Sequence, residues 1–168
     1  MFFEFGQNYK QYARIMLERR PAAKANIKGS AVYKNLHGTA YFYPVSGGVL
    51  VVTEVFGLPV QPDAGGAFGV FGYHIHAGNH CSGTAEDPFA DTRGHFNPGE
   101  TLHPYHAGDM PPLFGNDGYA YSAFVTDRFT IEDILGRTVI IHDHPDDFKT
   151  QPSGDSGKKI ACGEIRRV

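Results

Sequence analysis

Residues 38–56 read GTAYFYPVSGGVLVVTEVF. β-Branched and aromatic residues fill both halves of this stretch, and Ser46-Gly47-Gly48 divides it. The pattern predicts two β-strands, Gly38–Pro44 and Gly48–Phe56, that pair as a hairpin, because glycine adopts the backbone conformations that a tight turn needs. The fold is therefore expected to be built from β-strands.

Similar runs occur on both sides of this hairpin. We expect further strands at Ala31–Tyr33, Phe68–His76, Tyr119–Thr126, Arg137–His142 and Lys159–Ile165. The 21 glycines and 11 prolines supply many turns between them. Short β-favouring runs separated by turn residues are typical of an all-β sandwich or barrel.

One helix is expected, at Gln7–Arg20, where apolar residues recur at three- and four-residue steps before Pro21. A second, single helical turn is expected after Thr130, whose spacing to Asp133 fits a capping box. Residues 1–25 are thus interpreted as a helical extension and residues 26–168 as one β-domain. The extension is expected to dock on this domain, or else to form a dimer or partner contact.

Composition excludes several classes of protein. The chain has 168 residues, which suits one globular domain, and a net charge of −3, which does not suit nucleic-acid binding. We find no apolar stretch that could span a bilayer and no secretory signal, so a cytoplasmic location without membrane contact is expected. If the substrate is an anion, positive charge must be concentrated locally.

Two cysteines, Cys81 and Cys162, lie far apart in the sequence. They form no Cys-x-x-Cys motif, so neither a zinc finger nor a dithiol redox motif is expected. Their spacing alone leaves open whether they form one disulfide or remain buried thiols.

Histidines are the most unusual feature of the sequence. All of the nine except His37 lie between His74 and His144, which makes a metal site the first hypothesis to test. Many of them fall in or beside a stretch rich in Gly, Pro, Asp and His that runs from Gly78 to Gly118. So long a loop is usually functional or disordered, and bound metal could order it.

Two groups of ligand candidates can be separated along the chain. His74 and His76 point to the same face of a strand, and His142 ends another strand. An isolated His-x-His pair is more often two half-buried polar residues than a metal site. His103, His106 and Asp109 form a second group, whose nitrogen and carboxylate ligands suit zinc.

His95 lies between these two groups in the sequence. As an imidazolate it could bind one metal through each ring nitrogen. It would then complete four ligands for zinc and give the first group four nitrogens, a set that favours Cu(II).

Five motifs in this order resemble those of the copper–zinc superoxide dismutases. The proline-containing segment up to Asp109 is most similar to the bacterial branch of that family. The resemblance covers roughly Ile27 to Ile165 and rests on His74-Ile75-His76, Gly94-His95-Phe96-Asn97-Pro98, His106-Ala107-Gly108-Asp109, Gly136–His142 and Ala161-Cys162-Gly163.

The resemblance implies a Greek-key β-barrel, immunoglobulin-like in its sandwich architecture, with long metal-binding loops. It implies a copper ion, a zinc ion and the substrate superoxide. The implied copper ligands are His74, His76, His95 and His142, and the implied zinc ligands are His95, His103, His106 and Asp109.

Three further roles follow from the resemblance alone. Asp146 would be the carboxylate that joins copper ligand His74 to zinc ligand His103, and Cys81 and Cys162 would form the family's disulfide. The family usually has an arginine beside copper two residues before the final Ala-Cys-Gly, where this chain has Lys159.

Lysine keeps the charge of that arginine but lacks its planar fork. We therefore expect an active dismutase in which His95 and Lys159 serve catalysis, with weaker guidance of the anion than in the family's fastest members. The alternative is a copper-binding or copper-delivery protein of the same fold with low dismutase activity. A zinc-stabilised binding module without copper is a third hypothesis, and it predicts a missing copper ligand that this sequence does not lack. The sequence leaves monomer and homodimer undecided.

Overall fold

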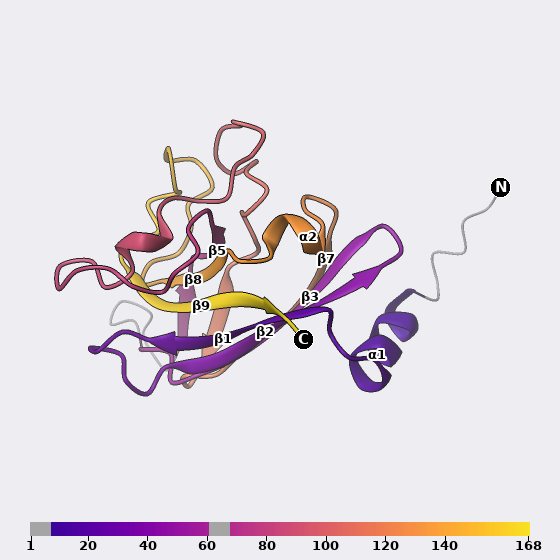
Figure 1. Ribbon diagram of the computed structural model, residues 1–168. Coiled ribbons are helices and arrows are strands. Elements are labelled where there is room, and N and C mark those ends of the chain that lie inside the picture. The colour runs from indigo at the N-terminus through magenta and orange to yellow at the C-terminus, as the bar shows by residue number, and fades with distance from the viewer. Residues whose placement is uncertain (1–7, 61–67) are drawn as a thin grey trace.

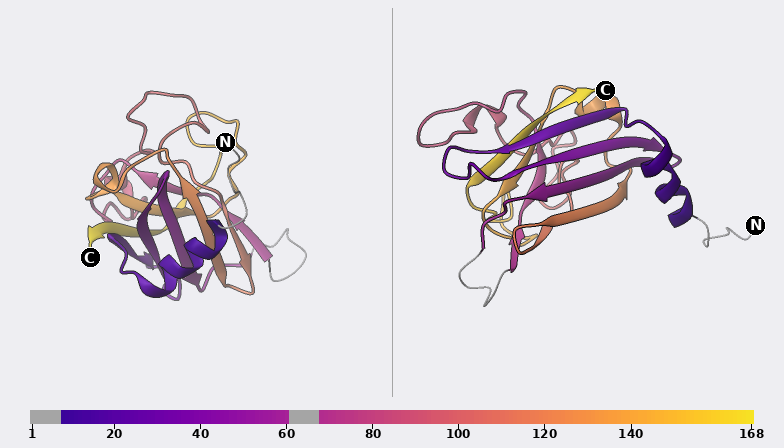
Figure 2. Two further views of the ribbon diagram at one scale, coloured as in Figure 1. Left: turned by 90° about the vertical axis from the view of Figure 1, so that its right-hand side faces the viewer. Right: turned by 90° about the horizontal axis from the view of Figure 1, so that it is seen from below.

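A computed structural model describes residues 8–60 and 68–168. Its main sheet contains seven antiparallel strands in the order β5-β8-β9-β1-β2-β3-β7, and β4 and β6 form a separate antiparallel pair. The ribbon shows that the main sheet is strongly curled, both in the first view (Figure 1) and in two further views (Figure 2). This is the all-β, barrel-like fold that the sequence predicted.

The elements have the following bounds. The helices are α1 (Asn8–Glu18), the 3-10 helix η2 (Ala90–Thr92) and α2 (Ile131–Ile134). The strands are β1 (Ala23–Gly29), β2 (His37–Val45), β3 (Gly48–Phe56), β4 (Phe68–Phe71), β5 (Tyr73–His76), β6 (Leu113–Asn116), β7 (Ala120–Thr126), β8 (Thr138–His142) and β9 (Lys159–Arg167).

The β2–β3 hairpin is confirmed, with Val45 opposite Gly48 across the turn. The last strand, β9, pairs with both β1 and β8, so the C-terminal segment lies between the first strand and the strand that carries His142. This insertion gives the sheet a Greek-key order. The strands that carry His74, His76 and His142, β5 and β8, pair at one edge of the sheet.

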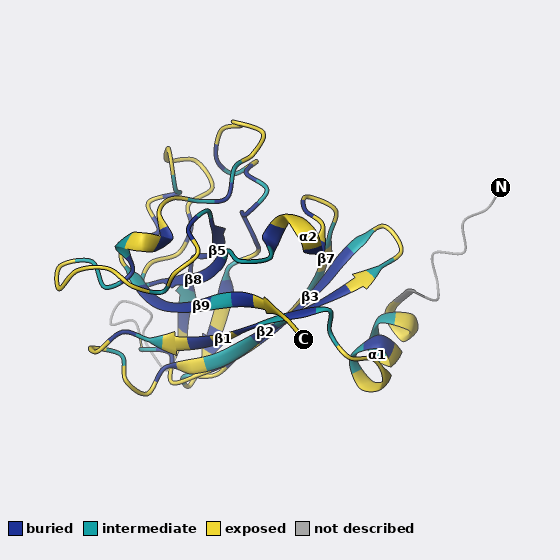
Figure 3. Ribbon diagram, in the orientation of Figure 1, coloured by how far each residue is buried: buried dark blue, intermediate teal, exposed yellow. Residues whose placement is uncertain are grey.

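The apolar core lies inside the curled sheet, and its strands alternate between buried and more exposed positions (Figure 3). Phe42, Phe71, Ile75, Leu113 and Ile141 are among its fully buried members. Each large aliphatic or aromatic side chain contributes about 1.5–3 kcal/mol on leaving water. The core thus provides a rigid frame for the polar residues at the sheet's end.

Helix α1 is confirmed within the described residues, whereas Gln7, at the start of the predicted range, lies outside them. The helix packs on the outer face of the sheet, where Ile15 is buried against Tyr43, Leu50 and Val52. A helix of 11 residues is marginal alone, so this contact accounts for its stability. No helix among the described residues is long and apolar enough to cross a membrane.

The prediction of a strand at Ala31–Tyr33 is wrong. Those residues form a turn, in which the Tyr33 N–H donates to Ser30 O, and the strand is β1, which begins at Ala23. β1 buries Ala23, Ala25 and Ile27 on one face. Two of these three buried residues are alanines, which are not typical of strands, so the sequence pattern does not indicate a strand here.

The predicted strand Phe68–His76 is divided at Gly72 into β4 and β5, which belong to different sheets. A Cβ at Gly72 would lie 2.8 Å from the Ser156 side chain, so the chain passes too close to its neighbour for any other residue. Strand β6 was not predicted, because it lies inside the stretch interpreted as one long loop. The turn after Thr130 is confirmed as α2, with both hydrogen bonds of a capping box.

Candidate metal centre

Two adjacent strands carry three of the candidate copper ligands. β5 pairs with β8, with Tyr73 opposite Ile141, and β5 supplies His74 and His76 while β8 ends at His142. All three histidines are almost fully buried, with exposed fractions of 4% or less. Alternation along β5 turns its two imidazoles away from the core, which receives Ile75 instead.

The long loop after β5 folds back over these strands. Isolated β-bridges join His76 to His95 and His74 to Asp109, and the Phe96 N–H donates to Ile75 O at 2.8 Å. These backbone contacts bring residues that are about twenty to thirty-five positions apart in the sequence into one cluster. Gly108 is required there, because a Cβ would lie 2.2 Å from the Ile75 carbonyl oxygen.

The cluster contains two groups of potential metal ligands. In each group the ligand atoms lie within 4.8 Å of one another. The first group is His74, His76, His95 and His142, and the second is His95, His103, His106 and Asp109. The structure therefore brings together every residue that the sequence assigned to the two sites.

His95 is the member that the two groups share. Its Nδ1 lies 2.8 Å from Asp109 Oδ1 and 3.4 Å from His106 Nδ1, in the second group. Its Nε2 is buried and has no hydrogen-bond partner among the described residues, and it is the nitrogen left for the first group, to which His95 also belongs. One imidazole ring thus presents a different nitrogen to each group.

The remaining ring nitrogens of the first group are held by hydrogen-bond acceptors. His76 Nδ1 lies 2.8 Å from Arg93 O, and His142 Nδ1 lies 3.3 Å from Gly157 O. A carbonyl oxygen only accepts, so each Nδ1 carries the proton and each Nε2 keeps a lone pair. These two Nε2 atoms lie only 3.3 Å apart, an arrangement that favours a cation between them.

Asp146 connects the two groups from outside. Its Oδ2 accepts from His74 Nε2 and its Oδ1 from His103 Nε2, each at 2.8 Å. These bonds fix both rings so that their Nδ1 atoms point inward. Gly154 is needed for this contact, because its φ is +67° and a Cβ would lie 2.1 Å from Asp146 Oδ1. No local pattern in the sequence indicates the role of this glycine.

The donor atoms fit metal ions at both positions. Within the part of the chain that the structure describes, His74 Nδ1, His95 Nε2 and His103 Nδ1 are buried without a hydrogen bond, which is costly unless another group binds them. His103 Nδ1 does lie 3.1 Å from Asp109 Oδ2, but in a geometry that forms no hydrogen bond. Four nitrogens suit Cu(II), and three nitrogens with a carboxylate suit zinc.

The electrostatics of the centre also suit metal binding. Burial lowers the pKa of His142 to about 4, and it lowers the pKa of His74 and of His76 well below the ordinary value. Burial also lowers the pKa of His106. Neutral imidazole is the form that binds a metal, so these side chains need not lose a proton first.

Asp109 is the anionic ligand candidate of the second group. Burial alone would raise the pKa of this carboxyl, but the hydrogen bond from His95 and the neighbouring histidine charges outweigh it and lower the pKa. The carboxylate therefore stays ionised and offers a charged oxygen to a cation.

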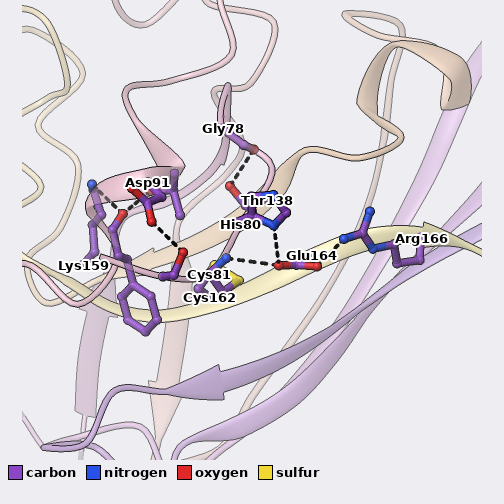
Figure 4. The surroundings of a disulfide bond; sticks show 12 residues. Gly78, His80, Cys81, Asp91, Thr138, Lys159, Cys162, Glu164 and Arg166 are labelled. Atoms are coloured by element: carbon purple, nitrogen blue, oxygen red, sulfur yellow. Dashed lines mark hydrogen bonds and ion pairs between the residues drawn. A yellow bond between two sulfur atoms is a disulfide. The ribbon is translucent and has the colours of Figure 1, made fainter. Parts of the chain in front are cut away.

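The disulfide that the resemblance implied is present. Cys81 and Cys162 are joined, with a Cα–Cα distance of 5.6 Å, and the bond connects the long loop to β9 (Figure 4). Phe89 from the same loop packs against Cys162 and Ile140. The loop is thereby anchored on the outer face of the strands beside the histidines.

Lys159, at the start of β9, is tied to this loop. Its Nζ lies 3.1 Å from Asp87 Oδ2 and donates to Phe89 O at 3.0 Å, and its side chain is 16% exposed (Figure 4). Its positive charge contributes to the lowered pKa of His142, so it acts electrostatically on the first group. The sequence did not reveal Asp87 as its partner.

Arg128 is a further residue that sequence reasoning missed. Its Nη1 donates to Pro104 O at 3.0 Å and lies 3.4 Å from both His106 O and Asp109 O. The guanidinium thus holds the backbone of the segment that carries the second group. The only sequence feature that could indicate this role is a basic residue just after a predicted strand, and such residues are common.

Replacing Arg128 with Met is expected to weaken zinc binding about tenfold, because supporting groups around a metal typically contribute a factor of ten or more. Arg128→Lys should fall between the native protein and Arg128→Met, since an ammonium reaches fewer carbonyls at once. Competition with a coloured zinc chelator measures the effect. Equal zinc affinities in all three proteins would contradict it.

His80 and His144 lie outside both groups, with side chains 62% and 66% exposed. His80 Nδ1 is 3.5 Å from Glu164 Oε1, and His144 Nδ1 is 2.6 Å from Asp143 Oδ1. Their exposure is typical of solvated histidines, although both are close in the sequence to ligand candidates.

Comparison with known proteins adds an independent observation. The sequence model of the family described as "Copper/zinc superoxide dismutase (SODC)" matches residues 36–165. "Superoxide dismutase [Cu-Zn] 2" of Aquifex aeolicus is 32% identical, over 96% of this chain and 90% of that protein. "Superoxide dismutase [Cu-Zn]" of Deinococcus radiodurans is 33% identical, over 78% of each.

A solved structure is also similar. It is a double mutant of a SOD-like protein from Bacillus subtilis, with a TM-score of 0.67 and 26% sequence identity. The match covers 85% of this chain and 96% of that one. The sequence comparisons match copper–zinc superoxide dismutases, and the structure comparison matches a SOD-like protein.

Proposed function

The chain belongs to the copper/zinc superoxide dismutase family, and from this membership we propose that it converts superoxide to dioxygen and hydrogen peroxide at the four-histidine group. The observation that carries the proposal is the shared residue His95, whose Nε2 and Nδ1 are directed to different ligand groups. A zinc-only binding module would not need a fourth buried nitrogen in the first group.

The ligand assignment is part of the proposal. His74, His76, His95 and His142 would hold copper, and His95, His103, His106 and Asp109 would hold zinc. Copper held by these histidines would supply redox chemistry, accepting an electron from one superoxide and returning it to the next. The overall reaction consumes two superoxide anions and two protons and yields one dioxygen and one hydrogen peroxide.

The protein's own part is to orient nitrogens and to handle a proton. Arg93 O, Gly157 O and Asp146 keep the rings of the first group in one tautomer each. His95 Nε2 is buried and meets no competing protein group, so it is the atom that could hold a proton for peroxide formation. Asp109, whose Oδ1 lies 2.8 Å from Nδ1 of the same ring, would bind zinc beside that nitrogen, and the shared zinc would hold the ring in place while Nε2 carries the proton.

Lys159 is proposed as the residue that guides the anion. It stands where the family's arginine is expected, and its charge acts on His142. The ion pair with Asp87 offsets part of that charge. Guidance should therefore be present but attenuated, because steering depends on the net local potential.

Replacing Asp87 with Asn is expected to raise the second-order rate constant for superoxide by about two- to threefold at low salt, because one opposing charge is removed near the site. Lys159→Gln should lower the rate constant and remove most of its salt dependence. Pulse radiolysis at low and high ionic strength measures both.

The matched control for this test is Asp91→Asn. Asp91 lies on the same loop and accepts a hydrogen bond from Ser82, whereas the hydrogen bonds and the ion pair of Lys159 go to Asp87 and Phe89. This variant should leave the rate nearly unchanged. If Asp87→Asn and Asp91→Asn behave alike, the guidance proposal for Lys159 fails.

A copper-carrying protein of the same fold is the second candidate, and the offset charge of Lys159 is the observation that favours it. One experiment distinguishes the two functions. The chain loaded with copper and zinc is expected to consume superoxide in many turnovers per copper, whereas the chain loaded with zinc alone should not. A single turnover per copper, together with ready transfer of copper to a chelator, would favour the carrier.

A further inference from the structure

A groove of about 460 Å³ lies over the disulfide, on the outer face of β1 and β9, and none of its lining residues is a ligand candidate of the metal centre. Both cysteines and Phe89 line one part of it. Four charged side chains line the rest: Lys24, Lys28, Glu164 and Arg166. The groove therefore combines a reactive bond with a concentration of charge, and nothing in the proposed dismutase chemistry uses it.

Positive side chains outnumber negative ones in the groove. Glu164 is fully engaged, since its Oε1 accepts the Cys81 N–H at 3.2 Å and its Oε2 pairs with Arg166 (Figure 4). Lys24 and Lys28 make no ion pair with any residue in the described ranges 8–60 and 68–168. The groove thus carries two uncompensated positive charges, although the chain as a whole has a net charge of −3.

The two cysteine residues differ in how far they are buried. Cys162 is 2% exposed, whereas Cys81 is only partly buried and lies at the groove. A thiolate that enters the groove therefore reaches Cys81 first. Lys28 is the cross-strand partner of Cys162 and lines the groove with it, so its positive charge would favour the thiolate that leaves.

We propose that this groove binds small thiols that carry a negative charge and directs them to the Cys81–Cys162 disulfide. The thiolate of the bound molecule attacks Cys81 Sγ, a mixed disulfide forms there, and Cys162 leaves as a thiolate. A second thiol molecule attacks the mixed disulfide and releases Cys81. Two thiols are oxidised to one small disulfide, and the protein disulfide takes up the two electrons. This inference does not depend on the dismutase activity.

The test uses three small thiols of similar size and different charge. 2-Mercaptoethanesulfonate is anionic, 2-mercaptoethanol is neutral and cysteamine is cationic. The full chain loaded with copper and zinc is incubated anaerobically with each, quenched with an alkylating agent, and analysed by mass spectrometry for modified Cys81 and Cys162. Each rate is corrected for the reagent's own thiol pKa, because nucleophilicity varies with it.

At low salt the anionic thiol is expected to react about fivefold faster than the neutral one, which is the effect of two unit charges at surface distances in water. The cationic thiol should be slower by a similar factor, and salt should reduce both differences. In Lys24→Gln/Lys28→Gln the three rates should converge. Lys10→Gln, which removes an exposed cation from α1 outside the groove, should leave them apart.

Two results would overturn the proposal. The corrected rates could be equal for all three thiols in the native chain, or the double lysine variant could retain the native preference.

Discussion

Replacing His142 with Ala is expected to abolish superoxide dismutation while zinc stays bound. His142 belongs only to the four-histidine group, and its Nε2 lies 3.3 Å from His76 Nε2. Groups that merely support a ligand contribute up to about a hundredfold to affinity or activity, so loss of a ligand itself should cost at least about a hundredfold. Metal analysis and pulse radiolysis of the same sample measure both effects.

His144→Ala is the matched control for this experiment. His144 lies two residues further along, but it is exposed and pairs with Asp143 rather than with the ligand groups. Its replacement should change neither copper content nor rate. If His142→Ala retains full activity, or if His144→Ala loses as much, the assignment of the first group is wrong.

The second large effect is expected for the disulfide. Replacing both Cys81 and Cys162 with Ala should lower the free energy of unfolding by about 4.5 kcal/mol, because the bond closes a loop across a sequence separation of 81 residues. The long loop and β9 would lose the covalent link that restricts the unfolded chain. Urea unfolding of native and variant proteins at equal metal content measures the difference.

The disulfide variant also tests how Lys159 is held. Phe89 and Asp87, which contact Lys159, lie on the loop that the disulfide anchors. Its rate with superoxide should therefore become less dependent on salt as the position of Lys159 becomes less fixed. A loss of stability below about 1 kcal/mol would contradict the loop-closure argument.

The fold was largely predictable where strands carry bulky β-branched residues. Gly48–Phe56 was predicted with its observed bounds, since its valines alternate strongly. The sequence does not predict β1, because its buried positions include two alanines. It predicts β4 and β5 as one strand, because no neighbouring residue indicates that Gly72 lies against another segment. These features depend on neighbours distant in sequence, which local patterns do not contain.

The candidate site was predictable for a different reason. Metal ligands must be a few residue types, so His and Asp at suitable spacings are recognisable from the sequence alone. Supporting contacts are not, because backbone carbonyls such as Arg93 O and charged partners such as Asp87 can be supplied by any loop that passes nearby. Arg128 and Gly154 belong to the same class of contact.

The metal centre depends on strand order as much as on its ligands. Because β9 lies between β1 and β8, the strand that begins at Lys159 runs beside the strand that ends at His142. The disulfide, Lys159 and the end of the first ligand group at His142 are thus held by adjacent strands. The groove over the disulfide lies on the outer face of the same strands.

The proposed function requires that His95 binds two different metals at once. A crystal structure of the chain loaded with copper and zinc, with anomalous data collected at both absorption edges, tests it most directly. We predict a copper peak within about 2.1 Å of His95 Nε2 and a zinc peak within about 2.1 Å of its Nδ1. A ring that contacts only one metal ion, or the same element at both positions under full loading, would contradict the account.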